Sequence, residues 1–138
     1  MIQRQQTLWL LLATLAAAFS FMFPFVVGEE MQKNLLSRRI VDAGDNLFIL
    51  LLTAGSMILS TVIIFLFKNR KQQMQLCLLG LLVSVSIIAL YILQMNKLVH
   101  TTLALSCVLP FAVTAGYVMA YRSIRKDEKL VKSLDKLR

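Results

Sequence analysis

Charge is scarce in this chain. Charged residues make up 16% of its 138 residues and hydrophobic residues 58%, whereas about a quarter of the residues in a soluble domain are charged. The few charges are grouped, and they leave uncharged apolar runs that a soluble core of this size cannot bury. The composition therefore excludes an ordinary soluble domain and indicates a membrane protein with room for one domain.

The chain also has only one histidine and two cysteines, which limits metal and haem chemistry. His100 alone cannot supply both axial ligands of a bis-histidine haem, and Cys77 does not complement it. Cys77 and Cys107 are expected in opposite leaflets, roughly 15 Å apart in depth at about 1.5 Å per helical residue, which is too far for a disulfide. Since no nucleophile–base pair is apparent either, we expect no catalytic, cofactor-binding or metal-binding residue, no cofactor, and a protein that is not an enzyme.

Four uncharged segments are long enough to cross a bilayer, whose core needs about 20 apolar residues of helix. They lack the polar alternation of membrane strands, so helices are the only spanning form that satisfies the backbone. We predict an all-α fold, a four-transmembrane-helix bundle that forms a single domain over residues 1–138 and has a cytosolic amphipathic C-terminal extension. The expected spans are residues 8–27, 47–67, 74–93 and 102–121, followed by a tail of residues 122–138. Pro110 is expected to kink the last span.

The net charge of +8 is explained by topology and not by nucleic-acid binding, because the basic residues flank the apolar runs. With the N-terminus in the cytosol, the cytosolic segments hold eleven Lys and Arg residues and the outer loops hold four, which follows the positive-inside rule. We predict a multi-pass protein of the bacterial inner membrane with both termini cytosolic. The first apolar run loosely matches a cleaved signal peptide, but it continues through Phe25, which favours a retained anchor.

The longest connection, residues 28–46, carries charges of both signs together with Leu35, Leu36, Ile40 and Val41. We expect it to form a short amphipathic turn that rests on the outer surface of the bilayer.

Small residues recur at four-residue spacing in the last span, as Ala112, Gly116 and Ala120. This spacing lets two helix backbones approach closely, so the three residues are a candidate helix-packing face within the bundle or a docking face for another membrane protein. Hydroxyl residues lie at mid-membrane positions, among them Ser56, Ser60, Ser84 and Ser106. They either bond to helix backbones or line a polar pathway, and a closed, dry core would exclude the second interpretation.

The tail combines a basic face with an apolar stripe at helical spacing and contains no Gly or Pro. Its candidate docking or lipid-binding residues are Arg125, Lys129, Lys132 and Lys136 on the basic face, and Leu130, Leu134 and Leu137 on the apolar stripe. Such a helix lies on anionic headgroups or docks a cytosolic partner. Asp127, Glu128 and Asp135 favour a mixed-charge protein interface.

Three stretches carry a family resemblance: MIQR at 1–4, FLFKNRK at 65–71 followed by QMQLC at 73–77, and IRKDEKLVKSLDKLR at 124–138. Over essentially the whole chain they resemble an uncharacterised family of small four-helix inner-membrane proteins of Bacteroidota. The resemblance implies a topology and a location, and it carries no activity and no catalytic residue.

The features together predict a non-enzymatic integral inner-membrane accessory or structural subunit of a larger assembly. Its expected partners are membrane lipid and another inner-membrane protein or complex, with no nucleic acid. It would dock through small-residue helix faces and the basic C-terminal helix. The alternative is a small transporter or lipid-handling membrane protein with a hydroxyl-lined interior.

Overall fold

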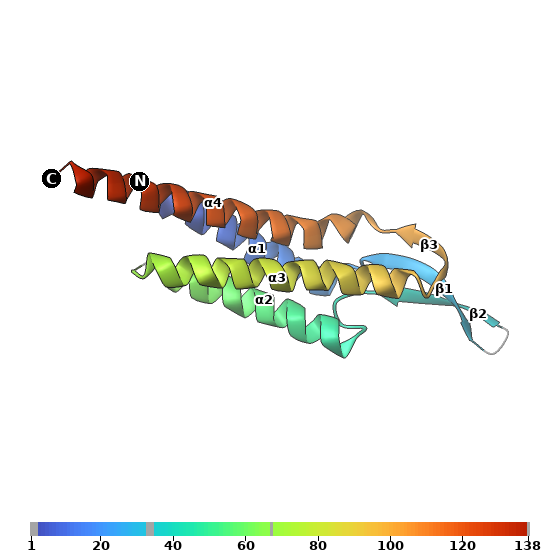
Figure 1. Ribbon diagram of the computed structural model, residues 1–138. Coiled ribbons are helices and arrows are strands. Elements are labelled where there is room, and N and C mark those ends of the chain that lie inside the picture. The colour runs from blue at the N-terminus through green and yellow to red at the C-terminus, as the bar shows by residue number, and fades with distance from the viewer. Residues whose placement is uncertain (1–2, 33–34, 67, 138) are drawn as a thin grey trace.

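The computed structural model describes residues 3–32, 35–66 and 68–137. Four long helices dominate this part of the chain, and three short strands lie between them (Figure 1). The elements in chain order are α1 Gln3–Met22, β1 Val26–Gln32, β2 Leu35–Val41, α2 Leu47–Phe65, α3 Arg70–Met95, β3 Val99–Leu103, the short 3₁₀ helix η1 Leu105–Cys107 and α4 Val108–Lys136.

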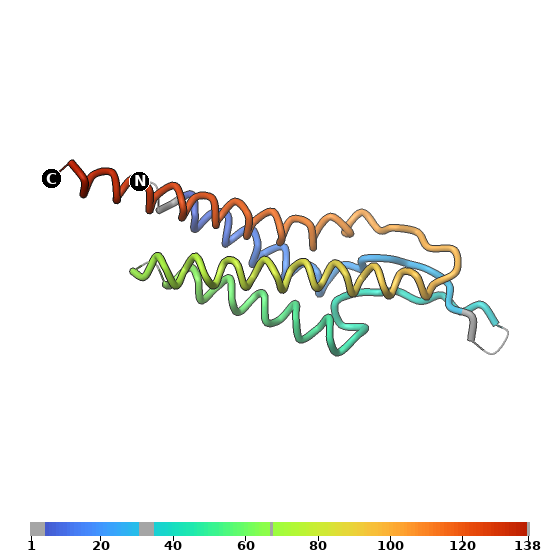
Figure 2. The backbone as a smooth tube through the Cα atoms, in the orientation of Figure 1, coloured from blue at the N-terminus to red at the C-terminus, as the bar shows by residue number. Residues whose placement is uncertain are grey.

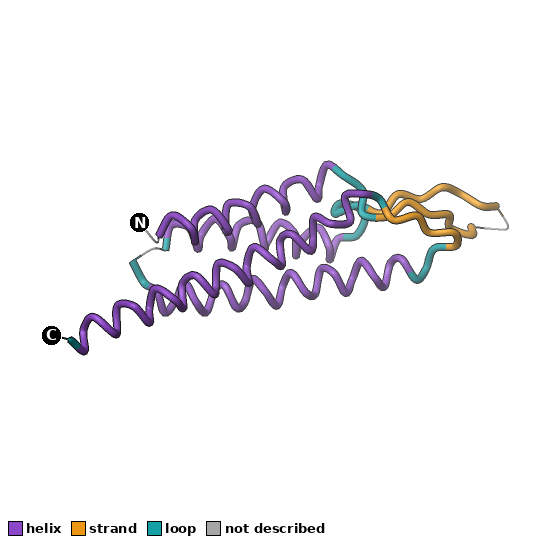
Figure 3. Tube along the Cα trace, turned by 90° about the horizontal axis from the view of Figure 1, so that it is seen from above, coloured by secondary structure: helices purple, strands orange, loops and turns teal. Residues whose placement is uncertain are grey.

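The helices run side by side as an elongated bundle (Figures 1 and 2), in which α1 packs on α2 and α4, and α3 also packs on α2 and α4. Both chain termini lie at one end, which we call the terminal end, and the strands lie at the other, which we call the sheet end (Figure 3). Within the described residues, four helices are long and apolar enough to cross a membrane. The prediction of four spanning helices is therefore confirmed at the level of length and composition.

The predicted boundaries need correction at the sheet end. Helix α1 ends at Met22 and not at residue 27, because Pro24 follows and the chain turns into a strand. Helix α4 begins at Val108, six residues after the predicted start at 102. Pro110 therefore lies in the first helical turn, where backbone N–H groups have no intrahelical acceptor. The predicted kink inside the last span is wrong for this reason.

The strands form a three-stranded antiparallel sheet in the order β2-β1-β3. In the centre, Val26 pairs with Val41 on one side and with Leu103 on the other. The all-α prediction is thus incomplete, and the connection predicted as an amphipathic turn is a β-hairpin over its described residues. Residues 33–34, which include Lys33 of the predicted turn, lie outside the described part.

Packing beneath the sheet joins it to the helices. The ring of Phe25 stacks on that of Tyr91 of α3, with centroids 4.2 Å apart, and both side chains are buried. Gly28 sits at an irregularity in the β1–β3 pairing, and a Cβ there would lie 2.9 Å from Leu98 Cδ1. A side chain at position 28 would therefore require the Leu98 side chain, in the turn between α3 and β3, to shift.

A second buried cluster occupies the half of the bundle nearer the terminal end. It is built from all four helices and includes Leu10, Ile63, Cys77, Tyr117 and Ile124, each with no exposed surface. Ile124 lies beyond the predicted end of the last span, so helix α4 continues to pack against the bundle past residue 121. The tail predicted to begin at residue 122 is correspondingly shorter as a free segment.

Candidate functional site

The hydroxyl groups of the interior donate hydrogen bonds to backbone carbonyls of their own helices. Thr53 donates a hydrogen bond to the Ile49 carbonyl at 2.7 Å, and Ser84 donates one to the Leu81 carbonyl at 2.8 Å. Ser56 likewise bonds to the Thr53 carbonyl at 2.8 Å. The space among these side chains measures about 10 Å³, at the lower limit of about 10–15 Å³ that one water molecule requires.

The remaining predicted pathway residues do not extend this space. Ser60 bonds to the Met57 carbonyl at 2.9 Å and to the hydroxyl of Thr14 on α1, 2.8 Å away. Ser106 precedes α4 and donates its hydroxyl to the carbonyl of Pro24. The four serines therefore make hydrogen bonds at separate places, and the small space among the interior hydroxyls is lined by Ser56 and Ser84 but not by Ser60 or Ser106.

The face formed by Ala112, Gly116 and Ala120 lies against α1. A Cβ on Gly116 would lie 2.9 Å from Ala13 Cβ and 3.0 Å from the Trp9 carbonyl oxygen, so the two backbones approach closely there. Ala120 is completely buried, and Ala112 is half-buried beside a surface groove. Packing within the bundle occupies most of this face, which leaves little of it to dock another protein.

A polar cluster at the terminal end joins α1, α3 and α4. The side-chain amide of Gln6 donates a hydrogen bond to Asp127 Oδ2, and Arg70 donates one to the Asp127 carbonyl oxygen at 3.4 Å. Asp127 is only 6% exposed, and its Oδ1 is a buried oxygen without a hydrogen-bond partner. The assignment of Asp127 to an exposed mixed-charge surface is therefore wrong. Its position three residues after Ile124, on the same helix face, is the sequence signal for this burial.

Beyond Asp127, helix α4 projects past the bundle at the terminal end (Figures 1 and 2). The predicted apolar stripe is exposed there, with Leu130 at 43%, Leu134 at 65% and Leu137 at 86%. The predicted basic residues Arg125, Lys129, Lys132 and Lys136 are exposed as well. We call residues 128–137 the projecting segment.

One ion pair stabilises the start of the projecting segment. Lys132 Nζ lies 2.8 Å from Glu128 Oε1 across one helical turn. The hydrogen bond from Lys132 lowers the pKa of the Glu128 carboxyl, and the positive charges of Lys71 and Arg70 act in the same direction. Glu128 is therefore paired within the projecting segment itself, which carries three lysines against two acidic residues and has a net charge of +1.

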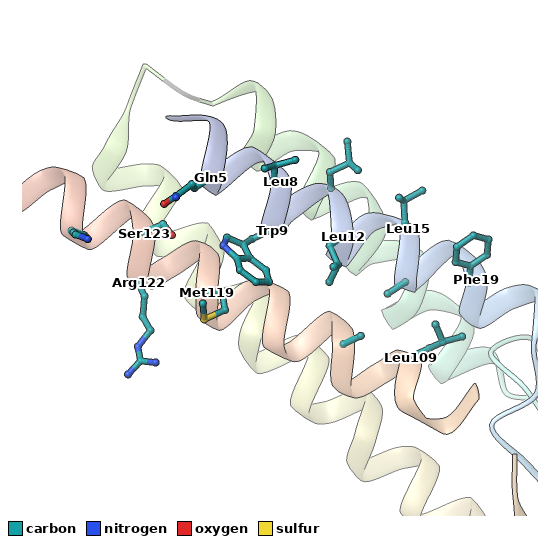
Figure 4. Close-up of a pocket in the computed structure, with 14 residues that line it drawn as sticks. Gln5, Leu8, Trp9, Leu12, Leu15, Phe19, Leu109, Met119, Arg122 and Ser123 are labelled. Atoms are coloured by element: carbon teal, nitrogen blue, oxygen red, sulfur yellow. The ribbon is translucent and has the colours of Figure 1, made fainter. Parts of the chain in front are cut away.

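A long groove opens between α1 and α4 on the outer surface of the bundle (Figure 4), with a volume of about 1020 Å³. Its walls are mostly leucine side chains of α1, together with Trp9 and Phe19, and Leu109 and Met119 of α4. Polar groups line it only towards the terminal end, where Arg122 and Lys126 belong to α4. The groove is not evident from the sequence, because its two walls come from opposite ends of the chain.

An ion-pair group orders the hairpin at the sheet end. Arg39 on β2 pairs with Glu30 on β1 and lies 3.3 Å from the Asp45 carboxylate. The hydrogen bond from Arg39 to Glu30 and the charge of Asp45 raise the pKa of the guanidinium above its ordinary value. This group ties the hairpin to the start of α2 and contains no nucleophile.

The histidine and the two cysteines belong to three different elements. His100 is exposed on β3 with a φ of 54°, while Cys77 is buried in α3 and Cys107 precedes α4 as a second free thiol. Over the described ranges, no three His, Cys, Asp or Glu side chains come together in an arrangement suited to a metal ion.

The chain belongs to a protein family described as a domain of unknown function (DUF4293), which matches residues 2–137. Comparison with curated proteins and with solved structures finds no match. The expected membership of a family without an assigned function, over essentially the whole chain, is confirmed in this form.

Proposed function

We propose that this member of the DUF4293 family is a non-enzymatic accessory subunit of a larger inner-membrane assembly, docked through its projecting segment. The observation that carries the proposal is the exposure of Leu130, Leu134 and Leu137 on a helix that extends beyond its own bundle. A stripe of this spacing is typical of helices that bind in an apolar groove of a partner protein. The small closed space among the interior hydroxyls supports this function over transport.

The orientation in the proposal is that both termini face the cytosol. It is supported by the eleven Lys and Arg residues assigned to the terminal side against four on the other side. In this orientation the sheet faces the outside, and the projecting segment enters the cytosol where a soluble domain or a partner subunit can reach it.

The direction of α4 favours a protein over a lipid surface as the docking partner. The helix is continuous from Val108 to Lys136 and has no Gly or Pro after residue 121 at which to bend. At about 1.5 Å per residue, the segment extends roughly 13 Å beyond the bundle along the axis of α4. A helix that lies on headgroups has to run in the plane of the membrane, which the direction of α4 opposes.

The test is recovery of partners with a tagged full-length chain from the native membrane in mild detergent, followed by mass spectrometry. The triple variant Leu130→Asp, Leu134→Asp and Leu137→Asp should lose the partner while its helical content and thermal stability remain those of the parent. The matched control replaces Lys129, Lys132 and Lys136 by Gln on the opposite face, and should retain the partner.

Two results would contradict the proposal. Recovery of the same partners with the leucine variant would mean that the stripe does not dock them. If the lysine variant loses both the partner and binding of its isolated tail peptide to anionic vesicles, while the leucine variant keeps both, the tail is a lipid anchor.

A further inference from the structure

The groove between α1 and α4 is shaped by an alternation of large and small side chains. Leu8, Leu12 and Leu15 form one wall on α1 and are between 41% and 64% exposed. Ala16 and Ala112 line the groove between the two helices. Because these alanines are short, the surface is hollowed where two helices with leucine at the same positions would fill it.

The charged residues of the groove lie at one end only. Its two charged residues are Arg122 and Lys126, one helical turn apart on α4 and both exposed. Gln5 and Ser123 add an amide and a hydroxyl near this end, and Arg122 extends outward from α4 (Figure 4). No acidic side chain lines the groove within the described residues.

The nearest acids on α4 do not cancel this charge. Asp127 is directed into the bundle, where Gln6 bonds to it. Glu128 is already paired with Lys132. The polar end of the groove therefore carries two cations that neither Asp127 nor Glu128 neutralises.

The dimensions correspond to one leaflet of a bilayer. From Arg122 to Leu109 the groove follows α4 for 13 residues, or about 20 Å at about 1.5 Å per residue. One leaflet of the hydrocarbon core is about 15 Å thick. An acyl chain that starts at the polar end is therefore covered by the groove along its whole depth in that leaflet.

We propose that this groove binds an anionic glycerophospholipid, with one acyl chain along the leucines of α1 and the headgroup beside Arg122 and Lys126. Basic pockets between transmembrane helices are suited to anionic headgroups, and cations bind phosphate oxygens through charge-assisted hydrogen bonds. The inference rests on the four helices crossing a membrane and does not depend on the projecting segment. It goes beyond the proposed function because it assigns a ligand to a different surface.

Trp9 provides the assay, because it is the only tryptophan of the chain and lines the groove. The purified chain is reconstituted in phosphatidylcholine vesicles that contain a small, fixed fraction of lipid with brominated acyl chains, which quench tryptophan fluorescence on contact. Brominated phosphatidylglycerol should be enriched at Trp9 over brominated phosphatidylcholine by about 30-fold, as expected for two basic residues near the surface.

The double variant Arg122→Gln/Lys126→Gln should lower this enrichment to near unity. The matched control is Arg125→Gln/Lys129→Gln, which removes the same charge from the same helix at exposed residues that do not line the groove. It should retain the enrichment. A second variant, Ala112→Leu, fills the groove between its walls and should reduce quenching by both lipids, whereas Ala115→Leu at an exposed position outside the groove should not.

Three results would overturn the proposal. Equal quenching by the two brominated lipids would mean that the groove contacts only the general lipid annulus. Equal loss of enrichment in the two charge variants would assign the effect to non-specific attraction by the basic tail. A Trp9 shielded from both lipids in the parent chain would mean that another helix, such as one from a second copy, fills the groove.

Discussion

Replacement of Gly80 by alanine tests how tightly the bundle is packed, because the Tyr117 ring of α4 lies against α3 at this residue. A Cβ at position 80 would lie 2.7 Å from Cζ and 2.9 Å from Cδ1 of the Tyr117 ring, with Cε1 nearer still. Real Cβ atoms essentially never show such separations, so either the ring or the helix has to move.

The Tyr117 ring has little room to move. Its side chain has no exposed surface and belongs to the same buried cluster as Ile63 and Cys77. Its hydroxyl donates a hydrogen bond to the Ser56 carbonyl on α2 at 2.7 Å. A shift of the ring therefore disturbs three helices at once.

The magnitude follows from three opposing contributions. Inserting a methyl group into a packed core costs about 1–3 kcal/mol, and weakening an interhelical hydrogen bond in a membrane bundle costs about 0.6 kcal/mol. Alanine is favoured over glycine inside a helix by about 0.5–1 kcal/mol. We therefore expect Gly80→Ala to lower the free energy of unfolding by about 1–3 kcal/mol.

Gly55→Ala is the matched control, since Gly55 is exposed on α2 and a Cβ there meets no atom within 4 Å. It should be neutral or stabilising by up to about 1 kcal/mol. The assay is unfolding in mixed micelles by added dodecyl sulfate, followed by the helical circular dichroism of each variant.

A double-mutant cycle identifies the ring as the cause. In a Tyr117→Leu background, where the clashing ring atoms are gone, Gly80→Ala should cost less than about 0.5 kcal/mol. The reasoning fails if Gly80→Ala unfolds at the same dodecyl sulfate fraction as Gly55→Ala, or if its cost is unchanged without the ring.

Two further predictions address the terminal end and the orientation. Gln6→Ala should lower the free energy of unfolding by about 1–3 kcal/mol, because it leaves the buried Asp127 carboxylate without the amide that donates to it. The control, Gln5→Ala at the exposed neighbouring position, should leave the free energy of unfolding unchanged. Equal stability of the two variants would refute the buried pair. Reporter fusions at the N-terminus, at Lys71 and at the C-terminus should read cytosolic and a fusion at Lys97 external, and an external C-terminus would refute the orientation.

The four helices were predictable because spanning length and apolar composition are local properties of about 20 consecutive residues. The projecting segment was predictable for the same reason, since Leu130, Leu134 and Leu137 repeat at helical spacing within one helix. The small-residue face of α4 was also recognised from its spacing, although the sequence left open whether it packs internally or docks a partner.

The sheet was not predictable from local pattern. The strand β1 begins within the last residues of the first apolar run, so Val26 and Val27 were predicted to belong to the end of a spanning helix. Its partner β3 lies more than 70 residues away, with Val26 opposite Leu103. Short strands of this kind depend on pairing with distant segments, and a single stretch of sequence does not reveal that pairing.

Tertiary structure also determined which polar and small residues are buried or packed between helices. Asp127 reads as a tail charge, and its burial depends on Gln6 of α1, 121 positions away. The groove likewise requires Leu12 of one helix beside Ala112 of another. Sequence by itself determined which segments are long and apolar enough to cross a membrane, because transfer from water depends on each segment's own composition. The fold alone decided which faces meet, because helix packing in a membrane depends on the shape of both surfaces.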